Sequence, residues 1–127
     1  MLGNDYAVTW ALGHLVQLAL PEAYGCVGFH REHLPILPHP FVLVPKQIPE
    51  DKKGYKSDPM ALKQLKIIDS LFKKCSSIIV ATDAGREGES IFRLVYNEAK
   101  CKKKMKRLWI SSMEDSAIKE GFDNLKD

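Results

Sequence analysis

Asp83 and Glu87 are the residues of this sequence whose types and spacing best suit chemistry. They follow the apolar, β-branched residues 78–80, and a strand there would deliver Asp83 to the turn at its end. Two carboxylates with room for water are the usual protein contribution to a magnesium site, where phosphate groups supply further oxygen ligands. The pattern therefore predicts that Asp83 and Glu87 bind Mg²⁺.

The residues around these carboxylates suit a phosphate. Gly85 and Gly88 allow close backbone approach, and a helix beginning near Arg86 would turn its N–H groups toward an anion. The Arg86 guanidinium could contact the same anion. The turn thus looks suited to a metal and a phosphodiester together. The alternative is that Asp83 only caps the helix, since acids are common in first turns.

Other phosphate-binding and catalytic motifs are absent from the sequence. A P-loop needs Lys and then Ser or Thr directly after its last glycine, and "GREGES" at residues 85–90 lacks this pair because Glu89 follows Gly88. The same stretch lacks the first half of a GxGxxG dinucleotide motif. No Ser/His/Asp or Cys/His nucleophile set can be assembled.

The second half of the chain predicts the elements that position the acidic turn. A helix capped by Asp58 and begun by Pro59 shows apolar residues at helical spacing. It is followed by a strand at 77–82, a helix at 86–99 and a strand at 106–111. Ser111 and Glu114 form a capping box for a last helix. Strands that alternate with helices predict an α/β fold, with a parallel sheet flanked by helices. In such sheets ligands bind beyond the carboxyl ends of the strands, where Asp83 lies.

The first half is less regular. We expect a strand at 6–12, then a short helical stretch at 13–20 that Pro21 ends. Residues 21–58 hold most of the prolines, so we expect a largely irregular segment with a short strand at 41–45.

Composition is that of an ordinary globular domain, with 45% hydrophobic and 28% charged residues. The net charge of +3 is weak support for an anionic partner. No signal peptide or membrane span is apparent, and three scattered cysteines favour a reducing compartment, so we expect a cytoplasmic protein. Four residues in one loop could bind zinc, although their spacing fits no common finger: Cys26, His30, His33 and His39.

The stretch "ATDAGREGE" at 81–89 resembles the acidic motif of the Toprim domain in type IA DNA topoisomerases, the topoisomerase III branch in particular. Three further stretches resemble this family in the same order: "YAVTWALGHLVQLALPEAYG", "LPILPHPF" and "KRLWISSMEDSAIKEGFDNL". The resemblance covers nearly all of residues 1–127. It implies one Toprim-type (Rossmann-like) domain, truncated at its N-terminus and lacking its first strand and helix, with 21–58 as an insertion.

The resemblance implies an ATP-independent enzyme that cleaves and religates single DNA strands, and so relaxes or decatenates DNA. Magnesium held by Toprim acids would assist a tyrosine from another domain of the polypeptide. None of the tyrosines here matches that nucleophile, so we expect residues 1–127 alone to be inactive. Rival interpretations are a different Toprim enzyme, such as a primase or nuclease, and a non-catalytic DNA-binding module.

The resemblance also implies site residues. Asp83 matches the first aspartate of the family's D-x-D motif, and Glu87 matches the acid two places after it. Gly85 stands where the second aspartate is commonest, so one metal ligand is missing. Arg86 would contact DNA phosphate or pair with an acid. His14, within "GHL", would act near the scissile phosphate or be a structural histidine.

Two further sets of residues are left with open roles. Glu89 belongs to the acidic motif, either as a metal ligand or as a first-turn residue that stabilises the helix dipole. The basic run 100–107 contains Lys102, Lys103 and Lys104, which would bind DNA phosphates without reading sequence. The alternative for this run is a solvated helix end.

Overall fold

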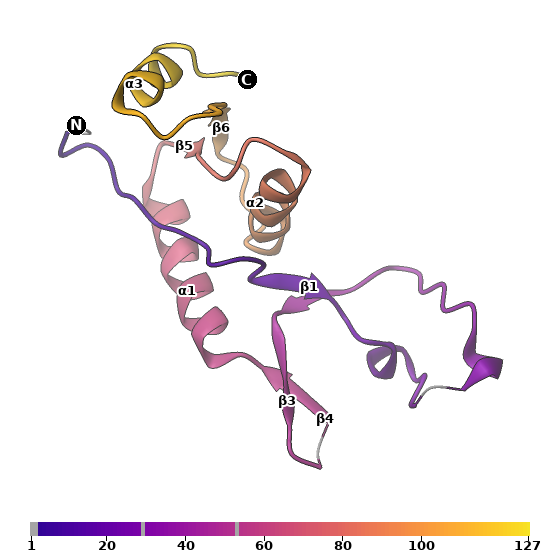
Figure 1. The fold of residues 1–127 in the computed structure, drawn as a ribbon. Helices are drawn as coiled ribbons and strands as arrows, with labels where there is room; N and C mark the ends of the chain where they lie inside the picture. Colours follow the sequence, from indigo (N-terminus) through magenta and orange to yellow (C-terminus); the bar gives the residue numbers. More distant parts are fainter. Residues whose placement is uncertain (1–2, 29, 53) are drawn as a thin grey trace.

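A computed structural model describes residues 3–28, 30–52 and 54–127. Figure 1 shows helices α1 and α2 beside a small sheet, with a hairpin and a long loop that project from them. The elements are β1 (Val16–Leu18), the 3-10 turns η1 (Pro21–Tyr24) and η2 (Arg31–His33), β2 (Leu43–Pro45), β3 (Gln47–Glu50), β4 (Gly54–Ser57), α1 (Pro59–Lys74), β5 (Ser77–Val80), α2 (Arg86–Glu98), β6 (Lys104–Arg107) and α3 (Asp115–Asp123).

The parallel sheet consists of β5 and β6, joined through α2. Ser77 lies beside Lys104 and Val80 beside Arg107, so both strands end at the same edge. Ile78 and Val80 are buried, and they form a core cluster with Phe92 of α2. The α/β class with a parallel sheet flanked by helices is confirmed. The parallel pair is narrow because the predicted strand at 6–12 does not join it.

Helix α1 begins where the sequence predicts. The Asp58 carboxylate accepts a hydrogen bond of 2.9 Å from the Met60 N–H, and Pro59 occupies the first helical position. Ala61 and Ile68 are buried one above the other on the face that meets the rest of the protein. The cap and the spacing of apolar residues thus determine both the start of α1 and its buried face.

Helix α2 joins the two core clusters. Its Val95 packs with Val16 and Ile68, whereas its Phe92 packs against the parallel sheet. The predicted helix at 86–99 is confirmed to within one residue. Because Phe92 and Val95 on the buried face of α2 contact both core clusters, the position of the helix is fixed relative to the sheet.

The predicted strand at 106–111 lies too far along the chain. Strand β6 is Lys104–Arg107, because its register is set by pairing with β5 rather than by the apolar residues that follow. Leu108 still donates its N–H to the Val80 carbonyl, at 2.9 Å. On its other side β6 meets the C-terminal segment, through an antiparallel bridge between Arg107 and Lys126.

The predicted capping box at Ser111 and Glu114 is wrong. Helix α3 begins only at Asp115, with Glu114 as its N-cap and no side-chain capping bond. The Ser112 hydroxyl instead accepts a hydrogen bond from the Glu114 N–H. Helix α3 packs back onto the residues that follow β6. A β-carbon at Gly121 would lie only 2.7 Å from the Leu108 side chain, so a larger residue would not fit there.

Two predictions for the N-terminal region are also wrong. Residues 6–12 form no strand, because no neighbouring strand pairs with their backbone among the described residues; the Gln64 side chain bonds the Trp10 carbonyl instead. Residues 13–20 form no helix, because Val16–Leu18 pair antiparallel with β2 as strand β1. This pairing buries Val16 almost completely. The predicted strand at 41–45 is present as β2.

Residues 21–58 contain more regular structure than the sequence indicates. Strands β3 and β4 form an antiparallel hairpin, which the prolines and charges of this segment obscure. His30 and His33 stack edge to face, with ring centroids 5.3 Å apart. Among the described residues no three His, Cys, Asp or Glu side chains are grouped as metal ligands. Cys26, Cys75 and Cys101 are free and half-buried. No helix in the described ranges is long and apolar enough to cross a membrane.

Candidate functional site

The acidic turn connects the carboxyl end of β5 to the first turn of α2. Asp83, Arg86 and Glu87 all have exposed side chains here. Parallel strands leave this edge of a sheet open to ligands, and the N–H groups of the first turn of α2 face the same side. The structure therefore places the predicted carboxylates where the sequence reasoning requires them, in contact with solvent.

Gly88 brings the helix close against the turn. A β-carbon at Gly88 would overlap the Asp83 backbone, lying 2.7 Å from its nitrogen and 2.8 Å from its carbonyl carbon. No side chain fits in that space, so Gly88 is required for the close approach. Gly85 differs, since its backbone is extended, with φ of 174°, and a β-carbon there meets no atom within 4 Å. Gly85 is thus free to vary sterically, including to the aspartate that the family pattern favours.

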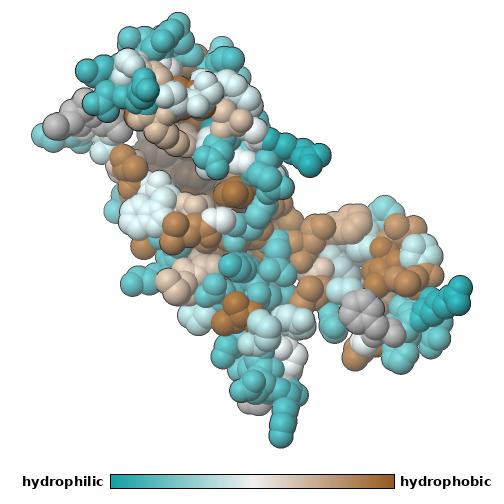
Figure 2. Space-filling model, viewed as in Figure 1, coloured by the Kyte–Doolittle hydropathy of each residue, from teal (hydrophilic) through white to brown (hydrophobic). Residues whose placement is uncertain are grey.

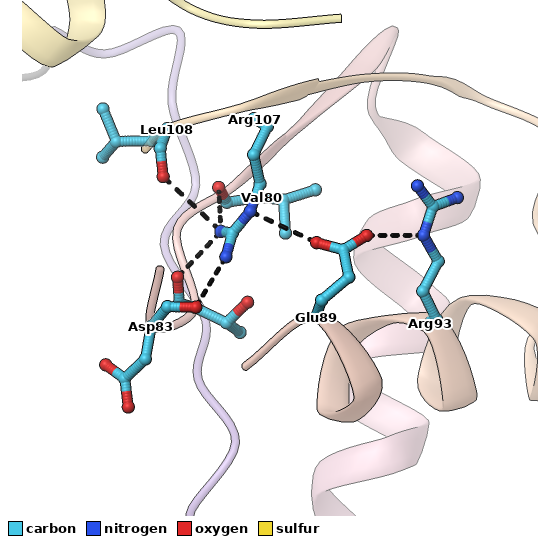
Figure 3. A network of polar contacts seen from close by, with 7 residues as sticks. Val80, Asp83, Glu89, Arg93, Arg107 and Leu108 are labelled. Atoms are coloured by element: carbon cyan, nitrogen blue, oxygen red, sulfur yellow. Dashed lines mark hydrogen bonds and ion pairs between the residues drawn. The ribbon is translucent and has the colours of Figure 1, made fainter. Parts of the chain in front are cut away.

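Arg107 binds the backbone of the turn through its guanidinium group (Figure 3). Its guanidinium donates from Nη1 to the carbonyl oxygens of Val80 at 2.9 Å and Thr82 at 2.7 Å. Its Nη2 donates to the Asp83 carbonyl at 2.7 Å. The residue is only 9% exposed. Because the buried guanidinium binds the carbonyl oxygens of Val80, Thr82 and Asp83, it fixes the backbone from which the Asp83 side chain projects.

Sequence reasoning missed Arg107, counting it within a basic run. One signal could have found it: Arg107 is the last residue of a strand, beside the strand that delivers Asp83, and a charged group at a buried strand end needs partners. Its neighbours in the run, Lys104 and Lys106, are exposed. The run therefore combines a structural arginine with solvated lysines.

Glu89 belongs to the same network and is half-buried. Its carboxylate lies 3.3 Å from Arg107 Nε and 2.7 Å from Arg93 Nε. In Figure 3 the Asp83 carboxylate points away from Arg107 and from Glu89. Glu89 thus pairs with two arginines, and the Asp83 carboxylate lies outside this network.

His14 reaches the acidic turn from a distant part of the sequence. Its Nε2 lies 2.9 Å from Glu87 Oε2, across 73 positions of the chain. Both side chains remain accessible, at 41% for His14 and 78% for Glu87. The pair joins the segment before β1 to the first turn of α2. The structure thus brings His14 and Glu87 together, as the resemblance implies for a shared site.

The basic residues predicted to bind DNA lie in two separate parts of the structure. Arg86 lies at the turn itself and takes part in none of the ion pairs formed by the described residues. Lys102 and Lys103 precede β6, and Lys104 begins it beside Ser77. These lysines therefore lie at the amino ends of the strands, separated from Asp83 by roughly 10 Å of strand. The structure does not bring them to the acidic turn.

The residues of the acidic turn are of the types that bind Mg²⁺ together with a phosphate. Mg²⁺ commonly takes one or two carboxylates and keeps its remaining positions for water and substrate phosphates. Asp83 and Glu87 supply exposed hard oxygen atoms, and the described residues form no cluster of three ligating side chains around them. His14 already contacts one oxygen of Glu87. Asp83, Glu87, water and a phosphate are thus a suitable ligand set for this ion.

Comparison with known proteins identifies the family of the chain. The Toprim domain family matches residues 1–113. The chain is 48% identical over 126 residues to DNA topoisomerase 3 of Bacillus licheniformis, and 45% identical to that of Bacillus subtilis. It is 49% identical over 127 residues to DNA topoisomerase 3 of Bacillus cereus. Each match covers 98% of this chain and 16% of the relative. The chain belongs to the Toprim domain family.

Proposed function

We propose that this chain is the magnesium-binding part of a type IA DNA topoisomerase, which cleaves one DNA strand, lets another pass and rejoins the break. Identity of 45–49% to proteins named DNA topoisomerase 3 supports this proposal. The observation that carries it is the 2.9 Å contact of His14 with Glu87, beside Asp83 at the carboxyl edge of the sheet. His14 and Glu87 thereby meet at the turn that carries Asp83, which supports approach of a phosphodiester there.

The residues of this chain have separate tasks. Asp83 and Glu87 hold the ion, while Arg107 and Gly88 fix the backbone that carries them. Bound Mg²⁺ neutralises negative charge on the phosphate. His14 orients the Glu87 carboxylate through their contact and is near enough to the turn to donate a hydrogen bond to the DNA backbone.

Arg86 binds a DNA phosphate beside the acidic turn, because its exposed guanidinium has no acidic partner among the described residues. Lys102, Lys103 and Lys104 contribute nonspecific phosphate contacts at the other edge of the sheet. The single strand would extend from the turn toward the rest of the polypeptide. Neutralising Arg86 should therefore weaken binding to every DNA sequence alike.

The attacking tyrosine comes from outside residues 1–127. The hydroxyls of two tyrosines in the chain already serve the structure, since Tyr24 accepts a hydrogen bond from the Val42 N–H and Tyr96 donates one to the Lys103 carbonyl. The full polypeptide would act in the cytoplasm, without ATP. Residues 1–127 supply the metal site and part of the DNA surface.

Relaxation of supercoiled plasmid tests this function. The full polypeptide should relax negatively supercoiled DNA with Mg²⁺ and no ATP, and Asp83→Asn should reduce the rate at least about tenfold. Residues 1–127 alone should leave the plasmid supercoiled. Linear or nicked product that is never resealed would indicate a nuclease and contradict the proposal, and so would relaxation by residues 1–127 alone.

A further inference from the structure

Glu89 joins the two segments that carry the candidate metal ligands. It lies in the first turn of α2, two residues after Glu87, and its Oε2 is 3.3 Å from Nε of Arg107. The same guanidinium donates from Nη2 to the Asp83 carbonyl at 2.7 Å, so one arginine lies between Glu89 and the acidic turn (Figure 3). Arg107 therefore contacts both the turn that holds Asp83 and the helix that holds Glu87.

The buried charge of Arg107 is compensated by Glu89. A cation that is removed from water needs hydrogen bonds and an opposite charge close by. The Nη atoms of Arg107 have carbonyl partners, whereas its Nε is buried and makes no hydrogen bond within the described ranges. Among the described residues, Glu89 is the only acid that pairs with Arg107. Removal of the Glu89 charge should therefore leave the guanidinium less firmly held at its present position.

Arg93 forms the second, outer pair of Glu89. Its Nε lies 2.7 Å from Glu89 Oε1, four residues along α2, and its side chain is 53% exposed. In Figure 2 teal, hydrophilic side chains cover much of the visible side of α2. Water screens an exposed ion pair far more than one with a buried partner. The pair with Arg107 should accordingly contribute more to the position of Glu89 than the pair with Arg93.

Both carboxylate oxygens of Glu89 already have partners. Oε1 contacts Arg93 and Oε2 contacts Arg107, so a metal ion at Glu89 would have to displace an arginine. The Asp83 carboxylate points away from this network (Figure 3). Of the two roles that the sequence leaves open for Glu89, that of a metal ligand thus finds no support in the geometry.

We propose that Glu89 is a positioning residue for the candidate metal site. Its pair with Arg107 holds the first turn of α2 against the turn after β5, and so sets the separation of the Asp83 and Glu87 carboxylates. This inference rests on the function proposed above. Mg²⁺ demands short bonds and near-ideal octahedral geometry, so a small shift of either backbone weakens binding even though both carboxylates remain. Residues that orient metal ligands typically contribute about 10- to 100-fold to affinity.

The Mn²⁺ affinities of three variants test this role. Glu89→Gln keeps the size of the side chain and removes its charge, and it should weaken Mn²⁺ binding to this chain about tenfold. Arg93→Gln is the matched control, since it removes the outer pair alone and should leave the affinity within about twofold. Asp83→Asn reports on the site itself. If Asp83→Asn weakens binding and Glu89→Gln does not, the positioning role is wrong while the proposed function stands.

A double-mutant cycle separates positioning from direct ligation. If Glu89 acts through Arg107, Glu89→Gln should change the affinity by less than about twofold once Arg107→Gln has removed the buried charge. A metal ligand would instead show its full effect in both backgrounds, which would overturn the proposal. Urea unfolding establishes that each variant is folded before its affinity is compared.

Backbone NMR without metal tests the same contact independently of ion binding and of any Arg107 variant. The Ala84 N–H belongs to the peptide group whose carbonyl Arg107 binds, so its signal should shift in Glu89→Gln and stay in place in Arg93→Gln. An Ala84 signal that does not move in Glu89→Gln would refute the positioning role, whether or not the chain binds Mn²⁺. Unchanged Mn²⁺ binding in Asp83→Asn would instead refute the proposed function, and the Ala84 signal would still decide the role of Glu89.

Discussion

Arg107 donates a hydrogen bond of 2.7 Å to the carbonyl oxygen of Asp83, and the same guanidinium also binds the carbonyls of Val80 and Thr82. The catalytic candidate is therefore positioned through its backbone, by a cation from the neighbouring strand. Its carboxylate stays uncommitted and can bind an ion. This separation of tasks allows the buried network to be perturbed without touching the metal ligands.

Replacement of Arg107 should destabilise the domain and loosen the turn. Arg107→Met leaves three carbonyl oxygens without their donor at a buried position, which should lower the free energy of unfolding by about 3 kcal/mol. The adjacent Lys106→Met is the control, since Lys106 forms only an exposed pair with Asp127 and should cost less than about 1 kcal/mol. Urea unfolding measures both. Equal losses would show that the Arg107 network adds no stability.

Gly88→Ala should be harmful, although alanine is normally the better helix residue by about 1 kcal/mol. The added methyl group would overlap the Asp83 backbone and push the turn away from α2, so we expect a loss of about 2 to 3 kcal/mol. Gly85→Ala makes the same change three residues earlier, where no atom lies within 4 Å, and should be tolerated. Thermal unfolding compares the pair. If Gly88→Ala proves as stable as Gly85→Ala, the close packing described here is incorrect.

Gly85→Asp should strengthen metal binding. Gly85 stands at the place of the family's second aspartate, its backbone is extended, and open space surrounds the position of a β-carbon. A third carboxylate at the turn should raise Mg²⁺ affinity about tenfold, measured by calorimetric titration. Gly85→Asn controls for size without charge. Equal affinities for the two variants would exclude the added carboxylate as a ligand.

The sequence predicted α1, β5 and α2 well because their signals are local. Asp58 and Pro59 determine the start of α1, and the apolar run at 78–80 determines β5. The first half could not be predicted this way, since Val16 adopts a strand only because β2 lies beside it. Likewise Asp83 and Glu87 stand out in the sequence, whereas the role of Arg107 depends on contacts 24 to 27 residues away.

Metal binding at Glu87 should change the surroundings of His14, which contacts one oxygen of the same carboxylate. Because His14 Nε2 and Mg²⁺ would use the same carboxylate, the side-chain NMR signals of His14 should shift during a Mg²⁺ titration. His30, His33 and His39 lie in the projecting segment and serve as internal controls. Metal binding that leaves the His14 signals unmoved would mean that Glu87 is not a ligand.

The most direct test of the whole account is the affinity of residues 1–127 for Mn²⁺, used as a paramagnetic substitute for Mg²⁺, in the unaltered chain and in Asp83→Asn. Asp69→Asn is the control, because Asp69 pairs with Lys73 on α1, away from the turn. We predict that Asp83→Asn weakens binding at least about tenfold, whereas Asp69→Asn leaves it unchanged. Binding of equal strength in all three proteins would contradict the assignment of Asp83 as a metal ligand.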